Sequence, residues 1–189
     1  MTLSLLWKLL LYGWLASEIL IGVATRTKRS SGKVHDRGSM LILWVVIATS
    51  ITASEGISEA TEPTMFGGAH ALKTAGVIVM LIALAIRWTA IWTLGKSFSS
   101  NVAILDSQQI NRTGLYRFVR HPSYLGLLLV FLAAGLHSRN WLALVVAVVP
   151  TTAALLYRIH VEEAALLAAF GSDYRDYSKS TKRLLPGVY

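Results

Sequence analysis

The sequence contains no cysteine and only ten acidic residues, against eighteen lysines and arginines. The absence of cysteine excludes disulfides, thiolate metal sites and cysteine nucleophiles. Charged residues make up 15% of the 189 positions, compared with roughly 25% in a typical soluble domain. Because 54% of the residues are hydrophobic and lie in long blocks, the sequence indicates an all-α integral membrane protein rather than a soluble or disordered one.

The net charge of +8 does not indicate nucleic-acid binding. The basic residues cluster beside the apolar blocks, where the positive-inside rule and anionic lipid headgroups account for them. No motif that reads a nucleic-acid groove is present. We therefore expect the lipid bilayer, and no nucleic acid, as a partner, while the oligomeric state stays open.

Five apolar blocks predict five transmembrane helices, over about 3–24, 39–57, 71–94, 124–136 and 141–157. The fourth block is short, because its thirteen residues would cover only about 20 Å of the roughly 30 Å hydrocarbon core. Only 137–140 separates it from the fifth, so we expect a tight antiparallel hairpin whose first helix does not fully cross on its own. The charged tail from Arg158 is expected to form an amphipathic helix at the membrane interface.

The charges of the connecting loops predict the orientation of these helices. The loops at 25–38 and 95–121 and the C-terminal tail are basic, whereas the loop at 54–69 is acidic. An N-terminus outside and a C-terminus in the cytoplasm satisfy the positive-inside rule at every loop. We expect one domain, 1–189, with a three-helix N-terminal part (1–94) and a cofactor-binding, catalytic part (95–189) at the cytoplasmic face.

A histidine–proline pair marks the expected start of the fourth helix. The residue before a proline avoids the helical region, and proline is favoured at the first helical position. His121 should therefore cap the helix that Pro122 opens, and such a helix start suits a carboxylate. A helix start with a basic interfacial flank explains the same residues, and spacing alone does not decide between the two interpretations.

Two charged residues near the last apolar block share one helix face, because Arg158 and Glu162 are four residues apart. An ordinary ion pair at the interface explains this spacing. Their apolar flanks nevertheless make both charges unfavourable without a partner. A cationic sulfonium would suit Glu162, and an anionic substrate headgroup would suit Arg158. Further along, Phe170-Gly171 indicates a helix stop, and the tyrosines that follow would anchor an interfacial helix.

Taken in order, these residues resemble the isoprenylcysteine carboxyl methyltransferase family and its prokaryotic relatives, within the wider phospholipid methyltransferase superfamily. The matching residues are Gly114-Leu115-Tyr116-Arg117, Arg120-His121-Pro122-Ser123-Tyr124-Leu125-Gly126, Arg158, Glu162-Glu163, Phe170-Gly171, Tyr174 and Leu185-Pro186. The resemblance implies transfer of a methyl group from S-adenosylmethionine to a lipophilic small-molecule or prenylated substrate. It favours carboxyl methylation of an isoprenylcysteine-like or isoprenoid acid at the cytoplasmic membrane face.

The resemblance also implies roles for individual residues. Arg158 and Glu162 match catalytic positions, with Arg158 on the substrate side. The positions that match cofactor contacts are Asn101, Gln108, Gln109, Ile110, Asn111, Tyr116, His121, Pro122, Ser123, Tyr124 and Glu162. No metal is required, since a sulfonium already activates its methyl group, and the protein has only to align the reacting atoms and exclude water.

Three other functions remain open at this point. A phospholipid or lipid-amine N-methyltransferase would share the cofactor and the architecture but attack with an amine. An NADPH-dependent sterol reductase has a similar C-terminal pattern, and a membrane scaffold would have no chemistry at all. The sequence does not decide whether the methyl acceptor is a carboxylate, an amine or a thiol.

Overall fold

The computed structural model describes residues 2–25, 33–34, 38–65, 68–99, 103–104 and 109–187. Its long helices are α1 (Leu3–Ala24), α2 (Ser39–Ala60), α3 (Ala69–Leu94), α4 (Pro122–Ser138) and α5 (Trp141–Ser180). Short 3₁₀ helices are η2 (Gly95–Ser97) and η3 (Gly114–Arg117), and the two-residue strands β1 (Lys33–Val34) and β2 (Ala103–Ile104) pair antiparallel.

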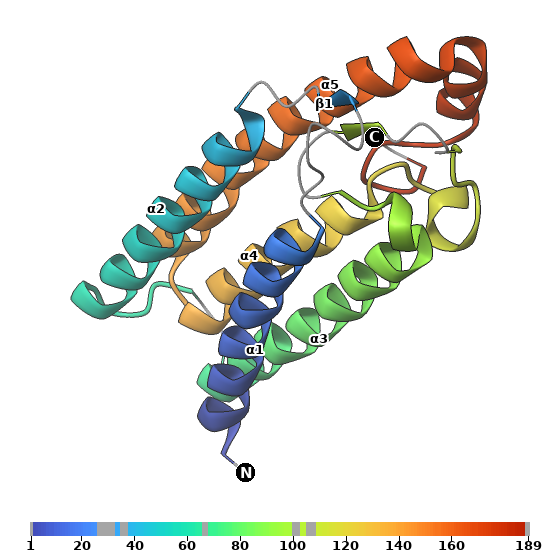
Figure 1. Cartoon of the computed structure of the whole chain (residues 1–189). Helices are drawn as coiled ribbons and strands as arrows, with labels where there is room; N and C mark the ends of the chain where they lie inside the picture. The colour runs from blue at the N-terminus through green and yellow to red at the C-terminus, as the bar shows by residue number, and fades with distance from the viewer. Residues whose placement is uncertain are drawn as a thin grey trace.

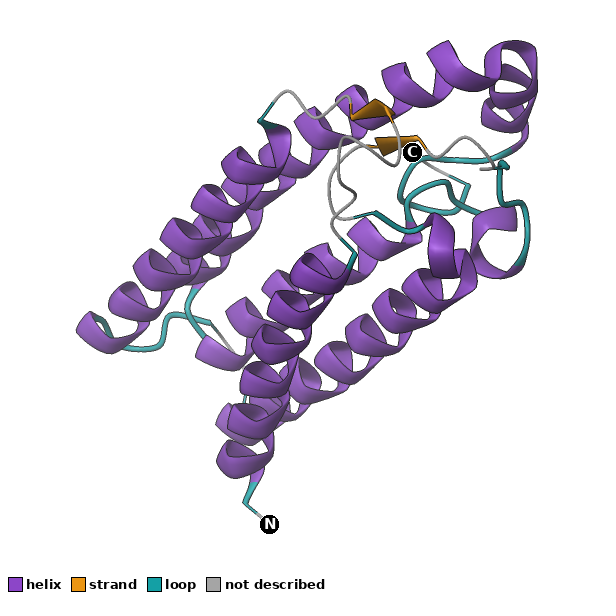
Figure 2. Ribbon diagram, viewed as in Figure 1, coloured by secondary structure: helices purple, strands orange, loops and turns teal. Residues whose placement is uncertain are grey.

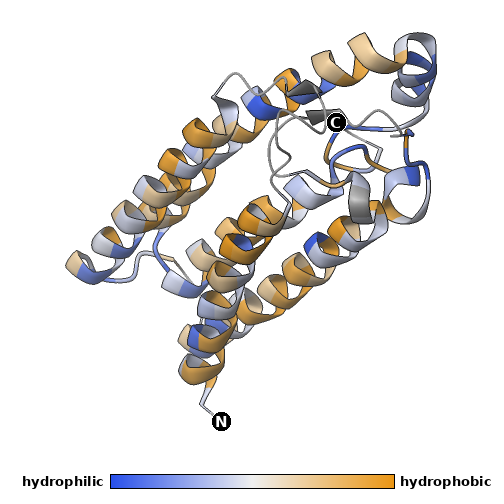
Figure 3. Ribbon diagram, in the orientation of Figure 1, coloured by the Kyte–Doolittle hydropathy of each residue, from blue (hydrophilic) through white to orange (hydrophobic). Residues whose placement is uncertain are grey.

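The helices have the length and composition of membrane spans. α1, α2, α3 and α5 are each long and apolar enough to cross a bilayer, whereas α4 has 17 residues. Apolar residues make up much of the helices (Figure 3), and many of them are exposed, such as Trp92 near the end of α3 at 87%. Such exposure suits contact with lipid and the aromatic belt of a membrane interface. The chain is a multi-pass integral membrane protein.

The α1–α2 and α3–α4 connections lie at one end of the bundle, and the α2–α3 and α4–α5 connections lie at the other (Figures 1 and 2). α2 packs against α5, while α4 packs against α3 and α5, and α1 packs against α3. The C-terminal ends of α1 and α3, the start of α2 and the start of α4 therefore lie near one another, and the chain's C-terminus lies there too (Figure 1). Any site built from the polar segments must lie at this end.

The predicted extents of the first three helices agree with the structure to within three residues. The fifth predicted span, 141–157, and the helix expected from Arg158 form one continuous helix, which runs to a bend at Gly171, where φ is 54° and ψ is −120°. This bend lies at the helix stop predicted from Phe170-Gly171. Charge alone does not end a helix. Between Arg158 and Phe170 the chain has neither glycine nor proline, so nothing breaks the helix before Gly171.

α3 and α4 approach closely enough to require glycine. A Cβ added at Gly126 of α4 would lie 2.8 Å from Cβ of Arg87 and 2.9 Å from the carbonyl oxygen of Ala83, both on α3. Small residues allow this kind of backbone approach, which gives membrane helices their dispersion contacts. Around the contact, Met80 and Phe131 are almost completely buried. The α3–α4 pair therefore forms the rigid centre of the bundle.

We expect Gly126→Ala to destabilise the protein by about 1–3 kcal/mol, as overpacking a tight core does. The new methyl group would meet a backbone carbonyl oxygen, which cannot move aside as a flexible side chain can. Thermal unfolding in detergent measures the effect. The matched control is Gly13→Ala on α1, where nothing lies within 4 Å of the added Cβ. Equal melting temperatures for the two variants would contradict the proposed close approach.

Candidate active site

The start of α4 has the predicted local structure. His121 is the N-cap residue, with φ −124° and ψ 56°, and Pro122 occupies the first turn. The C-terminal tail lies alongside the preceding segment, where Val119 and Lys182 form a parallel bridge. The backbone N–H of Arg120 donates to the carbonyl oxygen of Lys182 (2.7 Å), and that of His121 to Arg183 (3.0 Å). The tail, from here on meaning residues 172–187 after the bend at Gly171, therefore covers the N-terminal end of α4.

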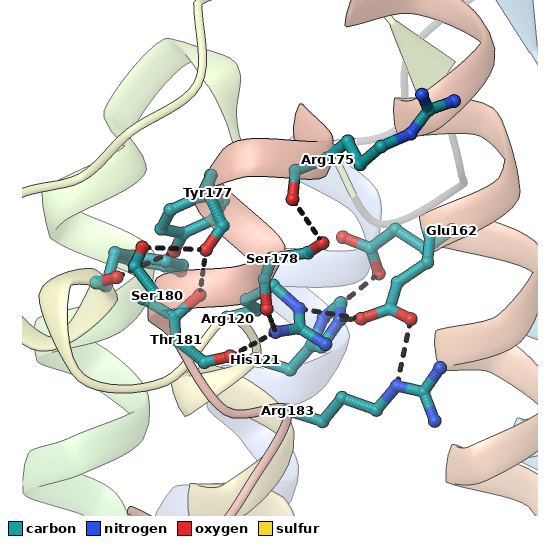
Figure 4. A network of polar contacts seen from close by, with 11 residues as sticks. Arg120, His121, Glu162, Arg175, Tyr177, Ser178, Ser180, Thr181 and Arg183 are labelled. Atoms are coloured by element: carbon teal, nitrogen blue, oxygen red, sulfur yellow. Dashed lines mark hydrogen bonds and ion pairs between the residues drawn. The ribbon is translucent and has the colours of Figure 1, made fainter. Parts of the chain in front are cut away.

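Glu163 of α5 holds this arrangement together. Its carboxylate accepts hydrogen bonds from Nε of Arg120 and from Nε of Arg183, each at 2.9 Å. Nε2 of His121 lies 3.3 Å from the same carboxylate. Arg120 also donates from Nη1 to the carbonyl oxygen of Ser178 (2.9 Å), as Figure 4 shows. One acidic side chain therefore joins α5, the α4 start and the tail.

A hydroxyl group bridges the two residues predicted to be catalytic. Nε of Arg158 donates to the hydroxyl oxygen of Tyr124 (2.9 Å), and this hydroxyl donates to Oε2 of Glu162 (2.6 Å). Nη1 of Arg158 also donates to Oγ of Ser39 at the start of α2 (3.1 Å). Arg158 is only 3% exposed, so its cation sits inside the protein and not at the interface expected from its position at the end of an apolar block.

His121 lies between two carboxylates of α5. Its Nδ1 is 3.9 Å from Oε2 of Glu162, and its Nε2 is 3.3 Å from Oε1 of Glu163. Its ring stacks on Tyr124 with 5.5 Å between centroids. The sequence predicted a carboxylate near the start of α4, and carboxylates of the chain itself lie there. The imidazole therefore fixes the relative positions of α4 and α5.

A second arginine, Arg87 of α3, also binds the first turn of α4. It forms a two-pronged ion pair with Glu18 of α1. Its Nη1 donates to the carbonyl oxygen (3.1 Å) and to Oγ (2.7 Å) of Ser123. A position near the end of an apolar block would allow an arginine to extend toward the interface, but Arg87 is buried and pairs with Glu18 instead. The sequence signal for this ion pair was one acidic and one basic residue, Glu18 and Arg87, each inside a different apolar block.

Tyr116 supports the site from η3. Its hydroxyl donates to the carbonyl oxygen of Ala90 (3.2 Å), and its own carbonyl oxygen accepts from the hydroxyl of Tyr177 (2.6 Å). Burial, with a smaller contribution from Glu162, raises the pKa of the Tyr116 phenol above its usual range. The phenol therefore stays protonated and acts as a hydrogen-bond donor that ties η3 to α3.

A cavity of about 880 Å³, including its part open to solvent, lies between these elements. Nine predicted site residues line it, namely Gln109, Ile110, Asn111, Tyr116, His121, Ser123, Tyr124, Arg158 and Glu162. Sequence reasoning missed further lining residues, which are Leu94, Ser97, Phe98, Ser99, Arg120, Leu166, Tyr174 and Tyr177.

Of the three remaining predicted cofactor positions, only Pro122 lies within the described residues, and it is not part of that lining. Asn101 and Gln108 lie outside the described residues. Pro122 is buried at the start of α4 and acts there through the helix geometry. The missed residues come mainly from the tail end of α5 and from the chain after α3, and local patterns do not reveal that these segments lie together.

A second cavity of about 570 Å³ adjoins the first. Its lining is mostly apolar and includes Trp14, Ile21, Leu43, Trp44, Ile47 and Leu127, together with Glu18 and Arg87. The two cavities share Phe98, Ser99, Tyr124 and Arg158. The bridged pair of Arg158 and Tyr124 therefore stands where a polar space meets an apolar one, which is the arrangement that a reaction on a lipophilic molecule requires.

Comparison with known proteins decides the family. The model of the isoprenylcysteine carboxyl methyltransferase (ICMT) family matches residues 76–168. Protein-S-isoprenylcysteine O-methyltransferase A of Arabidopsis thaliana is 31% identical over 133 residues, which cover 68% of each chain. This chain belongs to the isoprenylcysteine carboxyl methyltransferase family. The resemblance inferred from the sequence is confirmed, and the chain is a membrane methyltransferase.

Two further comparisons extend this result. Methanethiol S-methyltransferase of Mycobacterium tuberculosis is 39% identical over 72 residues, covering 38% of this chain and 28% of that protein. The solved structure of the eukaryotic intramembrane Ras methyltransferase ICMT superposes with a TM-score of 0.61 at 24% identity. The superposed part covers 76% of this chain and about half (52%) of the solved one. The likeness establishes the ICMT membrane fold. Membership decides against the reductase and the scaffold interpretations.

We expect Glu163→Gln to loosen the tail, because a neutral amide would face two guanidinium groups. Loss of hydrogen bonds to charged groups amounts to about 1.5–3 kcal/mol, which corresponds to roughly ten- to a hundredfold faster amide exchange in 172–187. Hydrogen exchange with mass spectrometry measures this. Asp176→Asn is the control, because its pair with Lys179 is exposed and contributes little. Unchanged protection of the tail in Glu163→Gln would contradict the role given to Glu163.

Proposed function

We propose that this methyltransferase uses S-adenosylmethionine to methylate the carboxylate of an isoprenylcysteine-like or isoprenoid acid. The observation that carries the proposal is the junction of the two cavities at Arg158 and Tyr124. A polar cavity suits the donor, and an apolar one suits the isoprenoid. The reacting carboxylate would then lie between them, beside a buried cation.

The residues of the polar cavity fit S-adenosylmethionine. This donor supplies a methyl group that its sulfonium already activates. Glu162 presents a carboxylate that is 32% exposed and is oriented by the hydroxyl of Tyr124, and this negative charge suits a sulfonium. Ile110 and Leu166 offer apolar contacts for an adenine ring. The tail over the start of α4 limits access of water to the cavity, which favours transfer to the substrate.

Arg158 is suited to hold the acceptor carboxylate. Hydrogen bonds to Tyr124 and Ser39 fix the direction of its guanidinium, so no reorganisation is needed when the anion arrives. A planar guanidinium can bind a carboxylate through two parallel hydrogen bonds, which a lysine cannot reproduce.

The isoprenoid part of the substrate would occupy the apolar cavity. Its walls come from α1, α2 and α4, with Leu43, Ile47 and Leu127 among the apolar side chains. A lipophilic molecule would reach it laterally from the bilayer, between the helices, and not through water. The relatives named above act on isoprenylcysteine in one case and on methanethiol in the other, so a thiol acceptor belongs in any direct test.

We also propose five membrane crossings, with the N-terminus outside and the active site in the cytoplasm. The end of the bundle that carries the site also carries the basic loops 25–38 and 95–121, while the acidic loop 54–69 belongs to the opposite end. Basic loops favour the cytoplasmic side. α4 would cover about 25 Å of the membrane at 1.5 Å per residue, and its two-residue link to α5 would complete the hairpin.

We expect Arg158→Ala to lower turnover by roughly a hundredfold or more, the loss that misplacement of a reacting group by about 1 Å can cause. Binding of S-adenosylhomocysteine, measured by calorimetry, should change little. Arg158→Lys should rescue only weakly, because it keeps the charge and loses the planar geometry. Arg175→Ala is the matched control, since Arg175 is exposed and lies outside both cavities.

The assay uses labelled S-adenosylmethionine with an isoprenylcysteine analogue, an isoprenoid thiol and phosphatidylethanolamine. Label on the carboxylate of the isoprenylcysteine analogue alone supports the proposal. Label on the thiol alone, or on the amine of phosphatidylethanolamine alone, would identify that group as the acceptor in its place. Equal losses of turnover and of S-adenosylhomocysteine binding in Arg158→Ala would refute the division of roles between Arg158 and Glu162.

The orientation is testable because the chain has no cysteine of its own. Ser172→Cys lies at the site end, and Glu62→Cys lies in the acidic loop. In intact cells a membrane-impermeant maleimide should label the second variant and leave the first unlabelled until the membrane is permeabilised. The reverse pattern would invert the topology.

A further inference from the structure

The space between α1, α2 and α4 contains two cavities in series. The apolar cavity beside the site is followed by an outer cavity of about 1180 Å³, including its part open to solvent. Along α2 the first is lined from Met40 to Ile47 and the second from Ile51 to Glu59. On α1 and on α4, too, the residues that line the outer cavity lie farther from the site than those that line the inner one. Both cavities therefore follow the same groove away from the site.

Trp14 is the residue that the two linings have in common. It lines both cavities and is 1% exposed. Its indole N–H donates to Glu18 (3.1 Å), and its ring contacts Phe131 edge-on with 6.0 Å between centroids. Glu18 is itself fixed by Arg87. The ring is therefore held across the groove on both sides and is not a loosely packed side chain that a ligand could displace.

The position of Trp14 sets the depth of the inner cavity. Ile47 lies seven positions after Met40 on α2, which corresponds to about 10 Å at 1.5 Å per residue. The whole groove from Met40 to Glu59 would extend over about 28 Å at the same rise. Removal of the ring would join the cavities, and a linear chain could then continue past Ile47 along the apolar part of the outer cavity, toward Ile51, Val130 and Ala134. The far end of that cavity is polar, with Lys8, Glu55 and Glu59 in its lining.

We propose that Trp14 limits the length of the isoprenoid chain that the enzyme accepts. The inference rests on the proposed function, because it assigns the inner cavity to the substrate's isoprenoid. A short chain ends against the indole ring, whereas a longer one must fold back or leave its end outside the cavity. Trp14 is thus a specificity-determining residue that contacts the far end of the substrate and takes no part in the methyl transfer.

The test compares S-geranyl, S-farnesyl and S-geranylgeranyl cysteine analogues as methyl acceptors. We expect kcat/KM of the wild-type enzyme to fall from the shortest to the longest chain. Trp14→Ala should raise the ratio of kcat/KM for the longest chain over the shortest by about tenfold or more, a size typical of added methylenes in an apolar pocket. Thermal stabilisation by unreactive analogues of the same lengths gives the same comparison without turnover.

Three variants separate length selection from a general structural effect. Trp14→Phe removes the N–H bonded to Glu18 but keeps a ring, so it should retain the wild-type order. Ala134→Trp, added to Trp14→Ala, refills the outer cavity that Ala134 lines and should restore the preference for short chains. Trp7→Ala, beyond Trp14 in the outer cavity, should leave the order unchanged. If Trp14→Ala does not fold, Trp14→Leu carries the same expectation.

An unchanged length ratio in Trp14→Ala, or equal shifts in Trp14→Ala and Trp14→Phe, would overturn the proposal. Failure of the proposed function gives a different result, namely no methyl transfer to any analogue by the wild-type enzyme. In that case the stabilisation series still reports whether Trp14 limits the length of chain that binds.

Discussion

A buried arginine inside a membrane protein needs a fixed partner, and here Arg87 and Arg158 both bind the first turn of α4. Arg87 reaches it from α3 through Ser123, and Arg158 reaches it from α5 through Tyr124. Each guanidinium would be unfavourable in an apolar environment without these contacts. The bonds therefore bring α3, α4 and α5 together at the one level of the bundle where the polar cavity opens.

This constraint explains why the site can be rigid although much of it comes from loops and the tail. Glu163 joins His121 and Arg120 to the tail, while Gly126 lets α3 approach α4 closely. The groups that would meet the reacting atoms are thus positioned before any ligand binds. Preorganised charges and dipoles of this kind stabilise a transition state without reorganisation during the reaction. Methyl transfer from a sulfonium requires little more from the protein than alignment.

Local patterns predicted part of this structure. The hydrophobic blocks gave the limits of α1 and α3, and the histidine–proline pair gave the start of α4, because both are properties of neighbouring residues. The partner of Arg87 was not predictable in the same way. An arginine near a helix end satisfies local rules equally well at the interface, and only the tertiary approach of α1 supplies Glu18. The course of the tail depends on similar long-range contacts.

The two cavities are lined by different parts of the chain. This division bears on how members of one family can use different acceptors. The segment matched by the family model, 76–168, contains His121, Tyr124 and Glu162, which line the polar cavity. α1 and α2 lie outside that segment, yet they form much of the apolar cavity's wall. With the cavities assigned as proposed above, changes in these two helices would reshape the acceptor side while the donor side stays intact. In this chain the acceptor cavity could therefore change without disturbing the contacts that hold the first turn of α4.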